Sequence, residues 1–207
     1  ERSNLAGVRH ILLVLSGKGG VGKSTVSTQL ALSLRHSGKK VGILDVDLCG
    51  PSIPRMFRVQ DNDVHQCDSG WVPVFVDQDR SISLMSIGFL LEKPDDAVVW
   101  RGPKKNGTVG RLLPLGTVWG AICTPGWVSA QTCPWLLVLH FCLSFGECLL
   151  QARRPSGQTD TPNLCCSPLQ AVSVGDVRRE LTFCKKTGLR VLGIVENMSG
   201  FVCPPCS

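Results

Sequence analysis

The chain has 207 residues, of which 43% are hydrophobic and 18% charged, and its formal net charge is +6. This length predicts one domain with a substantial core, and the composition excludes a disordered or collagen-like chain. The charge is spread thinly, as +3 over 1–106, +1 over 107–170 and +2 over 171–207. Because nucleic-acid binders usually concentrate positive charge in one patch, the net charge alone is weak evidence for that class.

The 11 cysteines are an odd number, and the first apolar run, 11–15, is too short for a secretory signal. We therefore expect a reducing compartment, in which the cysteines are thiols or metal ligands rather than disulfides. Because the chain starts at Glu1 and not at Met, we also expect it to be incomplete.

The strongest motif is Gly-Lys-Gly-Gly-Val-Gly-Lys-Ser at 17–24, which matches the phosphate-loop pattern G-x-x-x-x-G-K-[ST]. The apolar run 11–15 before it predicts a buried parallel strand. After it, apolar residues recur at helical spacing up to a helix-ending glycine, Gly38. An accidental glycine-rich turn does not explain both flanks, so we expect a strand, a phosphate loop and a helix.

Such a loop binds nucleotide through its backbone, because glycines let successive N–H groups approach phosphate oxygens at a helix N-terminus. We expect Lys23 to reach the β- and γ-phosphates of ATP and the Ser24 hydroxyl to bind Mg²⁺. The predicted nucleotide-binding residues of this loop are Gly17, Lys18, Gly19, Gly20, Val21, Gly22, Lys23, Ser24 and Thr25.

A second buried strand is predicted at 41–44, and two carboxylates, Asp45 and Asp47, follow it. Side chains two residues apart in a strand point the same way, and the carboxyl end of a strand beside a phosphate loop faces the ligand. We expect one carboxylate to join Ser24 in the magnesium shell and the other to orient the attacking water. A pair of solvated turn aspartates is the alternative.

Four runs carry a family resemblance. The phosphate loop with its extra lysine, Lys18, resembles the MinD, ParA and nitrogenase iron-protein superfamily. Asp-Val-Asp-Leu-Cys-Gly-Pro-Ser at 45–52, Trp-Arg-Gly-Pro at 100–103 and Val-Glu-Asn-Met-Ser at 195–199 resemble the Mrp-like scaffold ATPases of iron–sulfur cluster assembly. The resemblance covers about 4–106 and 171–207. It implies an α/β fold, a doubly wound and mostly parallel sheet.

Residues 107–170 interrupt this resemblance. The family implies a strand that ends in a magnesium-shell aspartate and is followed by a Pro-Pro-Gly-Thr switch. Here Thr-Pro-Gly at 124–126 resembles that switch only weakly, and Cys123 stands where the aspartate is expected. A neutral thiol cannot replace a hard oxygen ligand, so hydrolysis is doubtful. A strand is predicted at Leu136–Phe141, while the run 135–150 is too short and polar for a membrane span. The loss of the family's central strand is expected to compromise the sheet.

The composition of 107–170 also differs, with six cysteines and no lysine. The cysteines lack paired C-x-x-C spacing, so a zinc module is not expected. We hypothesise that this segment replaces a family exon, and an ordinary exon at the genomic locus, supported by many transcripts, would contradict this. The expected organisation is one incomplete P-loop domain over 1–207, family-like in 1–106 and 171–207.

The pattern returns after residue 170. Ser173 to Asp176 has capping-box spacing, a helical face with Val174, Val177, Leu181 and Cys184 follows, and Gly188 ends it. A buried strand is predicted at 191–195. Next come two closely spaced thiols, Cys203 and Cys206. A cluster needs four ligands, and a symmetric dimer supplies two from each chain. A half zinc site, a redox pair and a chance pair are alternatives.

The resemblance implies roles for single residues. Lys18 acts across a dimer on the partner's nucleotide, Asp47 positions water and Asn197 contacts adenine. Cys203 and Cys206 bind a [4Fe–4S] cluster that bridges two chains. The implied function is an ATP- and Mg²⁺-binding scaffold that passes the cluster to apo-proteins in the cytoplasm and, as a second compartment, the nucleus.

The implied partners are a second copy or the longer of two eukaryotic paralogues, and neither nucleic acid nor membrane. One alternative is a ParA- or MinD-type partitioning or positioning ATPase. A basic surface patch or a terminal amphipathic helix would favour this alternative. The other is a truncated isoform without function.

Overall fold

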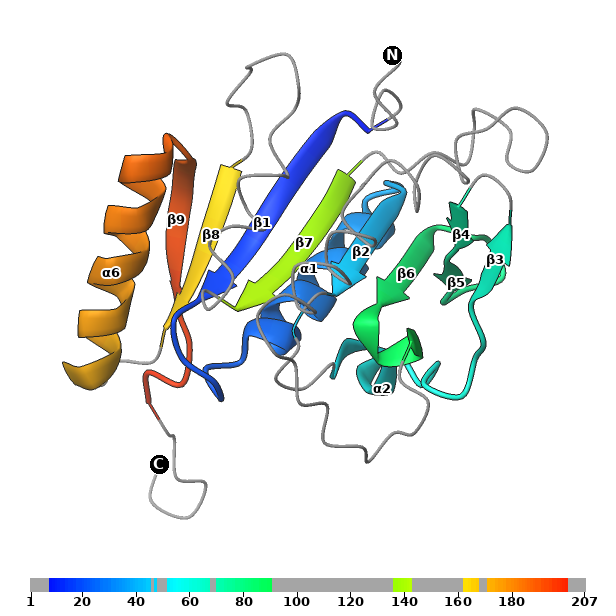
Figure 1. Ribbon diagram of the computed structural model, residues 1–207, viewed down its shortest axis with the longest axis horizontal. Coiled ribbons are helices and arrows are strands. Elements are labelled where there is room, and N and C mark those ends of the chain that lie inside the picture. The colour runs from blue at the N-terminus through cyan, green and yellow to red at the C-terminus, as the bar shows by residue number, and fades with distance from the viewer. Residues whose placement is uncertain are drawn as a thin grey trace.

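The computed structural model describes residues 8–45, 47, 52–67, 70–90, 136–142, 162–167 and 171–200. Its main feature is a seven-stranded sheet in the order β5-β6-β2-β7-β1-β8-β9 (Figure 1). All neighbouring strands are parallel except β5, which lies antiparallel to β6 at one edge. This architecture confirms the predicted fold class. The strands are β1 His10–Ser16, β2 Val41–Asp45, β5 Val74–Phe75, β6 Ile82–Ser86, β7 Leu136–Cys142, β8 Pro162–Ser167 and β9 Arg190–Glu196.

Helices and a hairpin complete the described part. Helix α1 packs against β1, β2 and β7, and helix α6 packs against β1, β8 and β9 (Figure 1). The short helices α2 and η1 lie near β6, and β3 and β4 form a separate antiparallel pair. The helices are α1 Lys23–His36, α2 Ile53–Met56, η1 Ile87–Leu90 and α6 Ala171–Thr187, and the hairpin is β3 His65–Cys67 and β4 Gly70–Val72.

The core forms along β1, β2 and β6. Leu13, Val14 and Leu15 are each 0% exposed, because β1 has a strand on either side and helices pack against it. Ile43 of β2 and Leu84 of β6 are also 0% exposed. Burial of each such side chain stabilises the fold by about 1.5–3 kcal/mol. This core fixes the carboxyl ends of β1 and β2, where the predicted site lies.

The expectation that the sheet lacks its central strand is wrong. Strand β7, Leu136–Cys142, lies between β1 and β2 and pairs with both in parallel. This confirms the strand predicted at 136–141. A continuous apolar run suits a central position, because it can be buried on both faces while its backbone groups pair with the strands on either side. The last two residues of the described strand, Phe141 and Cys142, are not carboxylates. Cys123 and 124–126 lie outside the described residues.

The C-terminal elements differ in detail from the prediction. Helix α6 begins at Ala171, so Ser173 lies inside the helix and is not its cap. Its hydroxyl is buried and without a hydrogen bond in the described part of the chain. Strand β9 is not buried, since Leu192 and Ile194 are 55% and 50% exposed. The strand lies at the edge of the sheet, where β8 is its one neighbour among the described strands.

Asp77 anchors the turn between β5 and β6. Its Oδ1 accepts hydrogen bonds from the backbone N–H groups of Ser81 and Ile82, at 2.8 and 3.1 Å. Its Oδ2 lies 2.8 Å from the Arg35 Nε of α1. Burial alone raises the pKa of Asp77, but the bonds from Ile82 and Ser81 and the Arg35 charge outweigh it, so the pKa lies below the ordinary 3.8. This carboxylate therefore ties the turn to α1.

Asp77→Ala is expected to lower the free energy of unfolding by about 2 kcal/mol at pH 7, since two charge-assisted bonds and an ion pair are lost. Because the folded pKa is depressed, this stabilisation is present above the unfolded value of 3.8 and is lost as pH falls through the folded pKa. Urea unfolding at pH 7 and pH 3 measures it. Asp79→Ala is the control, because Asp79 is 81% exposed and 3.8 Å from Arg35. Equal losses in both variants at pH 7 would contradict the prediction.

Candidate functional site

The phosphate loop lies between β1 and α1, as predicted. Gly20 and Gly22 have φ values of 76° and 86°, in the left-handed region that favours glycine. No side chain from the described residues caps α1, whose first N–H groups follow Gly22. Uncapped N–H groups at a helix start are a ready site for an anion. Both the loop and the start of the helix line one space.

That space is a cavity of about 460 Å³. The exposed Lys18 stands on its wall, and the Ser16 hydroxyl donates to the Lys18 carbonyl oxygen at 3.0 Å. The cavity brings together most predicted site residues with four that sequence reasoning missed, namely Ser16, Ser52, Met56 and Met198. Its lining consists of Ser16, Lys18, Gly19, Gly20, Val21, Gly22, Lys23, Ser24, Thr25, Asp47, Ser52, Met56 and Met198.

Lys23 and Asp47 form an ion pair across this cavity. The Lys23 Nζ donates to the Asp47 Oδ2, and the side chains are only 7% and 13% exposed. A buried ammonium requires an anionic partner, because desolvation of an isolated charge is costly. The Asp47 carboxylate thus fixes the position of the Lys23 ammonium at the cavity.

Ser24 meets a hydroxyl that the sequence analysis did not assign. The Ser52 hydroxyl, just before α2, donates to the Ser24 Oγ at 2.7 Å. Both side chains line the cavity together with Asp47. Two hydroxyls and a carboxylate are hard oxygen donors of the kind that Mg²⁺ prefers. The available signal was the serine that ends the run 45–52, seven residues after the strand-end Asp45.

Asp45 does not line the cavity, contrary to the expectation that it points the same way as Asp47. Strand β2 ends at Asp45, so the strict alternation of a strand no longer applies to Asp47. The Asp45 side chain is 0% exposed and accepts bonds from the Asp47 N–H at 3.2 Å and the Ser86 hydroxyl at 3.1 Å. Asp45 therefore positions the Asp47 backbone, and Ser86 of β6 is a supporting residue that the sequence did not reveal.

Asn197, just after β9, contacts the far end of the phosphate loop. Its Nδ2 donates to the Val21 carbonyl oxygen at 3.0 Å. A Cβ atom at Gly22 would lie 2.1 Å from the same Nδ2, so only glycine allows this approach. The neighbouring Met198 lines the cavity. The predicted contact of Asn197 with adenine stays a prediction.

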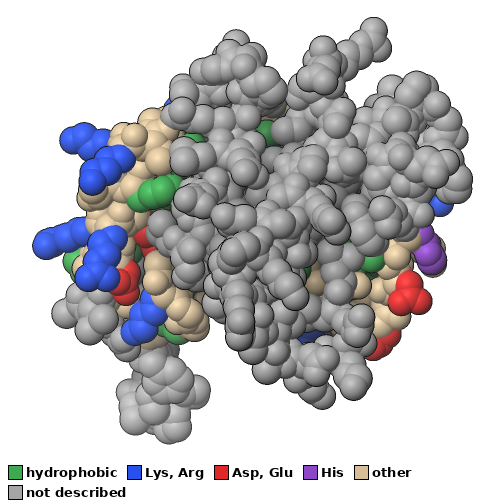
Figure 2. Space-filling view, viewed as in Figure 1, with side chains coloured by type: hydrophobic (Ala, Val, Ile, Leu, Met, Phe, Trp, Pro, Cys, Tyr) green, Lys and Arg blue, Asp and Glu red, His purple; other side chains and the backbone are tan. Residues whose placement is uncertain are grey.

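The predicted cluster ligands, Cys203 and Cys206, lie outside the described residues. Within the described ranges no three His, Cys, Asp or Glu side chains are placed to hold a metal ion. None of the helices in the described part is long and apolar enough to cross a bilayer. Helix α6 carries a cluster of exposed cations, Arg178, Arg179, Lys185 and Lys186 (Figure 2), which the charge count did not reveal.

Comparisons with known proteins agree with this geometry. A family model described as "ParA: NUBPL iron-transfer P-loop NTPase" matches residues 7–122 and 159–207. The chain is 72% identical to cytosolic Fe-S cluster assembly factor NUBP2 of Gallus gallus and 61% identical to that of Homo sapiens. Each match covers 100% of this chain and 72% of the relative. The stretch 123–158, which the family model leaves unmatched, lies within the atypical segment predicted at 107–170.

Solved structures give the same result. The chain resembles a nucleotide-binding protein from Archaeoglobus fulgidus in complex with ADP, at 33% identity and a TM-score of 0.72, over 98% of this chain and 72% of that chain. It resembles the cell division ATPase MinD of Pyrococcus furiosus in fold alone, at 18% identity and a TM-score of 0.58, over 96% of this chain and 77% of that chain. The chain therefore belongs to the ParA-type family of iron-transfer P-loop NTPases.

Proposed function

We propose that the chain is an ATP-binding scaffold on which a [4Fe–4S] cluster is assembled and from which it passes to apo-proteins. The observation that carries the proposal is the cavity of about 460 Å³ that the phosphate loop, Lys23 and Asp47 enclose. The family match and the names of the relatives support the cluster chemistry. Their cytosolic naming supports recipients in the cytosol, while nuclear recipients stay a prediction.

The donor set of the cavity suits ATP and Mg²⁺. Lys23 would bind the β- and γ-phosphates, while the Ser24 hydroxyl and the Asp47 carboxylate would hold the ion, which neutralises phosphate charge. To do so, the Lys23 ammonium would leave the Asp47 carboxylate and bind phosphate oxygens instead. Asp45, held by Ser86, would fix Asp47 from behind. Since β7 ends without a carboxylate, we propose that nucleotide binding acts more strongly than hydrolysis in gating cluster assembly or release.

The cluster, which is cargo, would be bound by Cys203 and Cys206 of two chains. Six residues separate Asn197 from Cys203 in numbering (203 − 197), and a chain spans at most ~3.6 Å per residue. The chain therefore tethers the Cα of Cys203 at no more than about 22 Å from the Cα of Asn197, a residue that touches the phosphate loop. This short tether supports coupling between nucleotide and cluster. The exposed Lys18 on the cavity wall supports a dimer with a second copy or the longer paralogue.

Anaerobic reconstitution with iron and sulfide tests the proposal. The purified chain is expected to bind about two irons per chain, since four cysteines from two chains hold four irons. A Cys203→Ala/Cys206→Ala variant is expected to lose the sulfur-to-iron absorption. The matched control, Cys49→Ala/Cys67→Ala, also removes two thiols but keeps the C-x-x-C pair of Cys203 and Cys206. Absorption that survives in the first variant, or disappears equally in the control, would overturn the assignment.

One observation favours a second function, that of a ParA-type partitioning ATPase. The cations of α6, Arg178, Arg179, Lys185 and Lys186, form the basic patch that the sequence analysis did not find (Figure 2). DNA binding with a steep salt dependence, lost when these four residues are neutralised, would support it. The C-x-x-C pair has no role in that function, so we favour the scaffold.

A further inference from the structure

Glu180 is a buried carboxylate for which the proposed function has so far no role. It lies in the middle of α6 and is 1% exposed. Its Oε2 has no hydrogen-bond partner within the described part of the chain. Carboxylates are almost never fully buried unless they are paired. Its retention inside the fold therefore calls for a specific contact.

That contact is the first glycine of the phosphate loop. The Gly17 N–H donates a hydrogen bond to the Glu180 carboxylate. A Cβ atom at Gly17 would lie 2.8 Å from the Glu180 Oε1 and 3.1 Å from the Asp176 Cβ. Helix α6 therefore approaches the loop so closely that only glycine fits at position 17. Glu180 reaches the loop from behind, and it is not part of the cavity lining.

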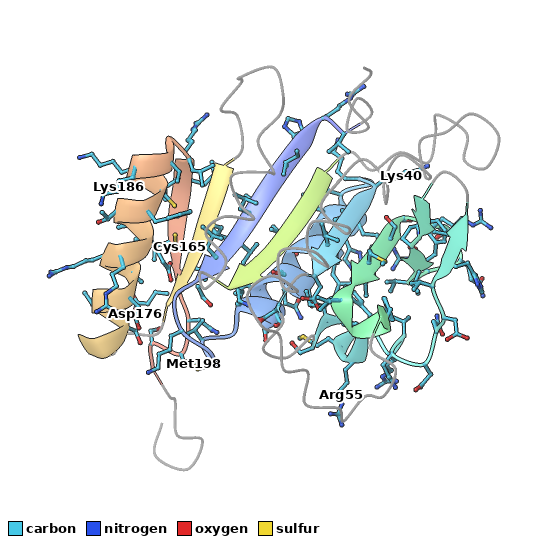
Figure 3. All side chains as sticks on the ribbon, viewed as in Figure 1. Lys40, Arg55, Cys165, Asp176, Lys186 and Met198 are labelled. Carbon is cyan, nitrogen blue, oxygen red and sulfur yellow. The ribbon has the colours of Figure 1, made fainter. Side chains whose placement is uncertain are left out.

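The other neighbours of Glu180 come from α6 and β8. The Cys165 thiol of β8 lies in hydrogen-bonding contact with the Glu180 carboxylate and with Cys184 of α6, and Figure 3 labels Cys165 and Asp176 in this region. Burial raises the pKa of Glu180 above 4.5, and the Asp176 charge adds to the rise, while the Gly17 N–H and Cys165 oppose it. Contact with Cys184, burial and the Glu180 charge raise the pKa of Cys165, so Cys165 remains a thiol.

We propose that Glu180 is a positioning residue that fixes the Gly17 peptide and so holds the phosphate loop open for nucleotide. A trans peptide points its N–H and C=O in opposite directions, so the bond to Glu180 determines the orientation of the whole peptide between β1 and the loop. Asn197 holds Val21 at the other end. The segment made of α6 and β9 thus contacts the loop at both ends. This inference rests on the proposed nucleotide binding.

The test compares two substitutions of Glu180 by titration with Mg-ADP. Glu180→Leu keeps a buried volume but removes the acceptor, so we expect the dissociation constant to rise by roughly 10- to 100-fold. Glu180→Gln keeps an acceptor oxygen for the Gly17 N–H, so the constant is expected to stay within about threefold of the wild type. Rescue by Gln separates positioning from a requirement for charge. The Gly17 amide resonance should move in the Leu variant and stay in the Gln variant.

Val177→Ala is the matched control, since Val177 is buried on the same helix, one turn earlier, at 9% exposure. It is expected to lower Tm but to leave the dissociation constant within about threefold. If Glu180→Leu does not fold, a Gln variant that loses affinity or shifts the Gly17 amide overturns the proposal, and a wild-type-like Gln variant supports it. A wild-type chain without nucleotide binding overturns the proposed function as well. A wild-type chain that binds, with an unchanged Leu variant, overturns the role of Glu180 alone.

Discussion

Lys23→Ala is expected to weaken Mg-ATP binding at least 100-fold, about 2.7 kcal/mol. The P-loop lysine contacts two phosphates, and charge-assisted hydrogen bonds contribute about 1.5–3 kcal/mol each. The same change leaves Asp47, which is 13% exposed, without its cation. Breaking a buried pair from one side is strongly destabilising. The variant is therefore expected to lose both affinity and stability, measured by calorimetric titration and urea unfolding.

The double variant Lys23→Ala/Asp47→Ala separates the two losses. Removal of both partners is expected to restore part of the stability, because no buried charge remains unpaired, but none of the affinity. Lys186→Ala is the control, since this lysine of α6 lies outside the cavity lining. Nucleotide affinity that persists in Lys23→Ala would contradict the assignment of the phosphate site.

Gly22→Ala is expected to lower the free energy of unfolding by about 2–3 kcal/mol and to weaken nucleotide binding in parallel. Its φ of 86° costs an alanine about 1–2 kcal/mol. The new methyl group would also lie 2.1 Å from the Asn197 Nδ2. Asn197 must then move and lose its 3.0 Å bond to Val21, about 1 kcal/mol more.

Gly38→Ala provides a control for strain alone. Gly38 has a similar φ of 74°, but no atom of the described chain lies within 4 Å of an added Cβ. We expect it to cost about 1–2 kcal/mol without changing nucleotide affinity. Asn197→Ala in the Gly22→Ala background should relieve the clash and recover part of the stability. If Gly22→Ala and Gly38→Ala behave alike, the close contact with Asn197 has no energetic role.

Local patterns were sufficient to predict the first half of the site. The apolar run of β1, the glycines and the helical spacing of α1 are contiguous in sequence, and the phosphate loop follows from them directly. The carboxylate Asp47 was also predicted, because strand ends meet at one edge of a parallel sheet. The predicted roles of Cys203 and Cys206 rest on spacing and resemblance, and no described residue tests them.

Residues whose environment depends on distant elements were not predictable. Glu180 has helical spacing with Val177 and Cys184, but its burial follows from the approach of α6 to Gly17, a contact across 163 positions (180 − 17). Likewise, the apolar strand β9 gave no sign of lying at the sheet edge. Strand β7 could be predicted from its composition, but its place between β1 and β2 depends on strand order.

The central place of β7 also determines when the sheet can form. Strand β1 pairs with β7 along its length, from His10 and Leu136 onward, a separation of 126 residues (136 − 10). Bringing together two strands so far apart in sequence costs conformational entropy before their contacts can offset it, and topologies with such long-range pairings fold slowly. At about 5–20 residues per second, a ribosome delivers β7 roughly 6–25 s after β1. Until then, the edges of β1 and β2 that pair with β7 in the folded sheet lack this partner. The N-terminal part that carries the phosphate loop is therefore most prone to misassociation during this period of synthesis.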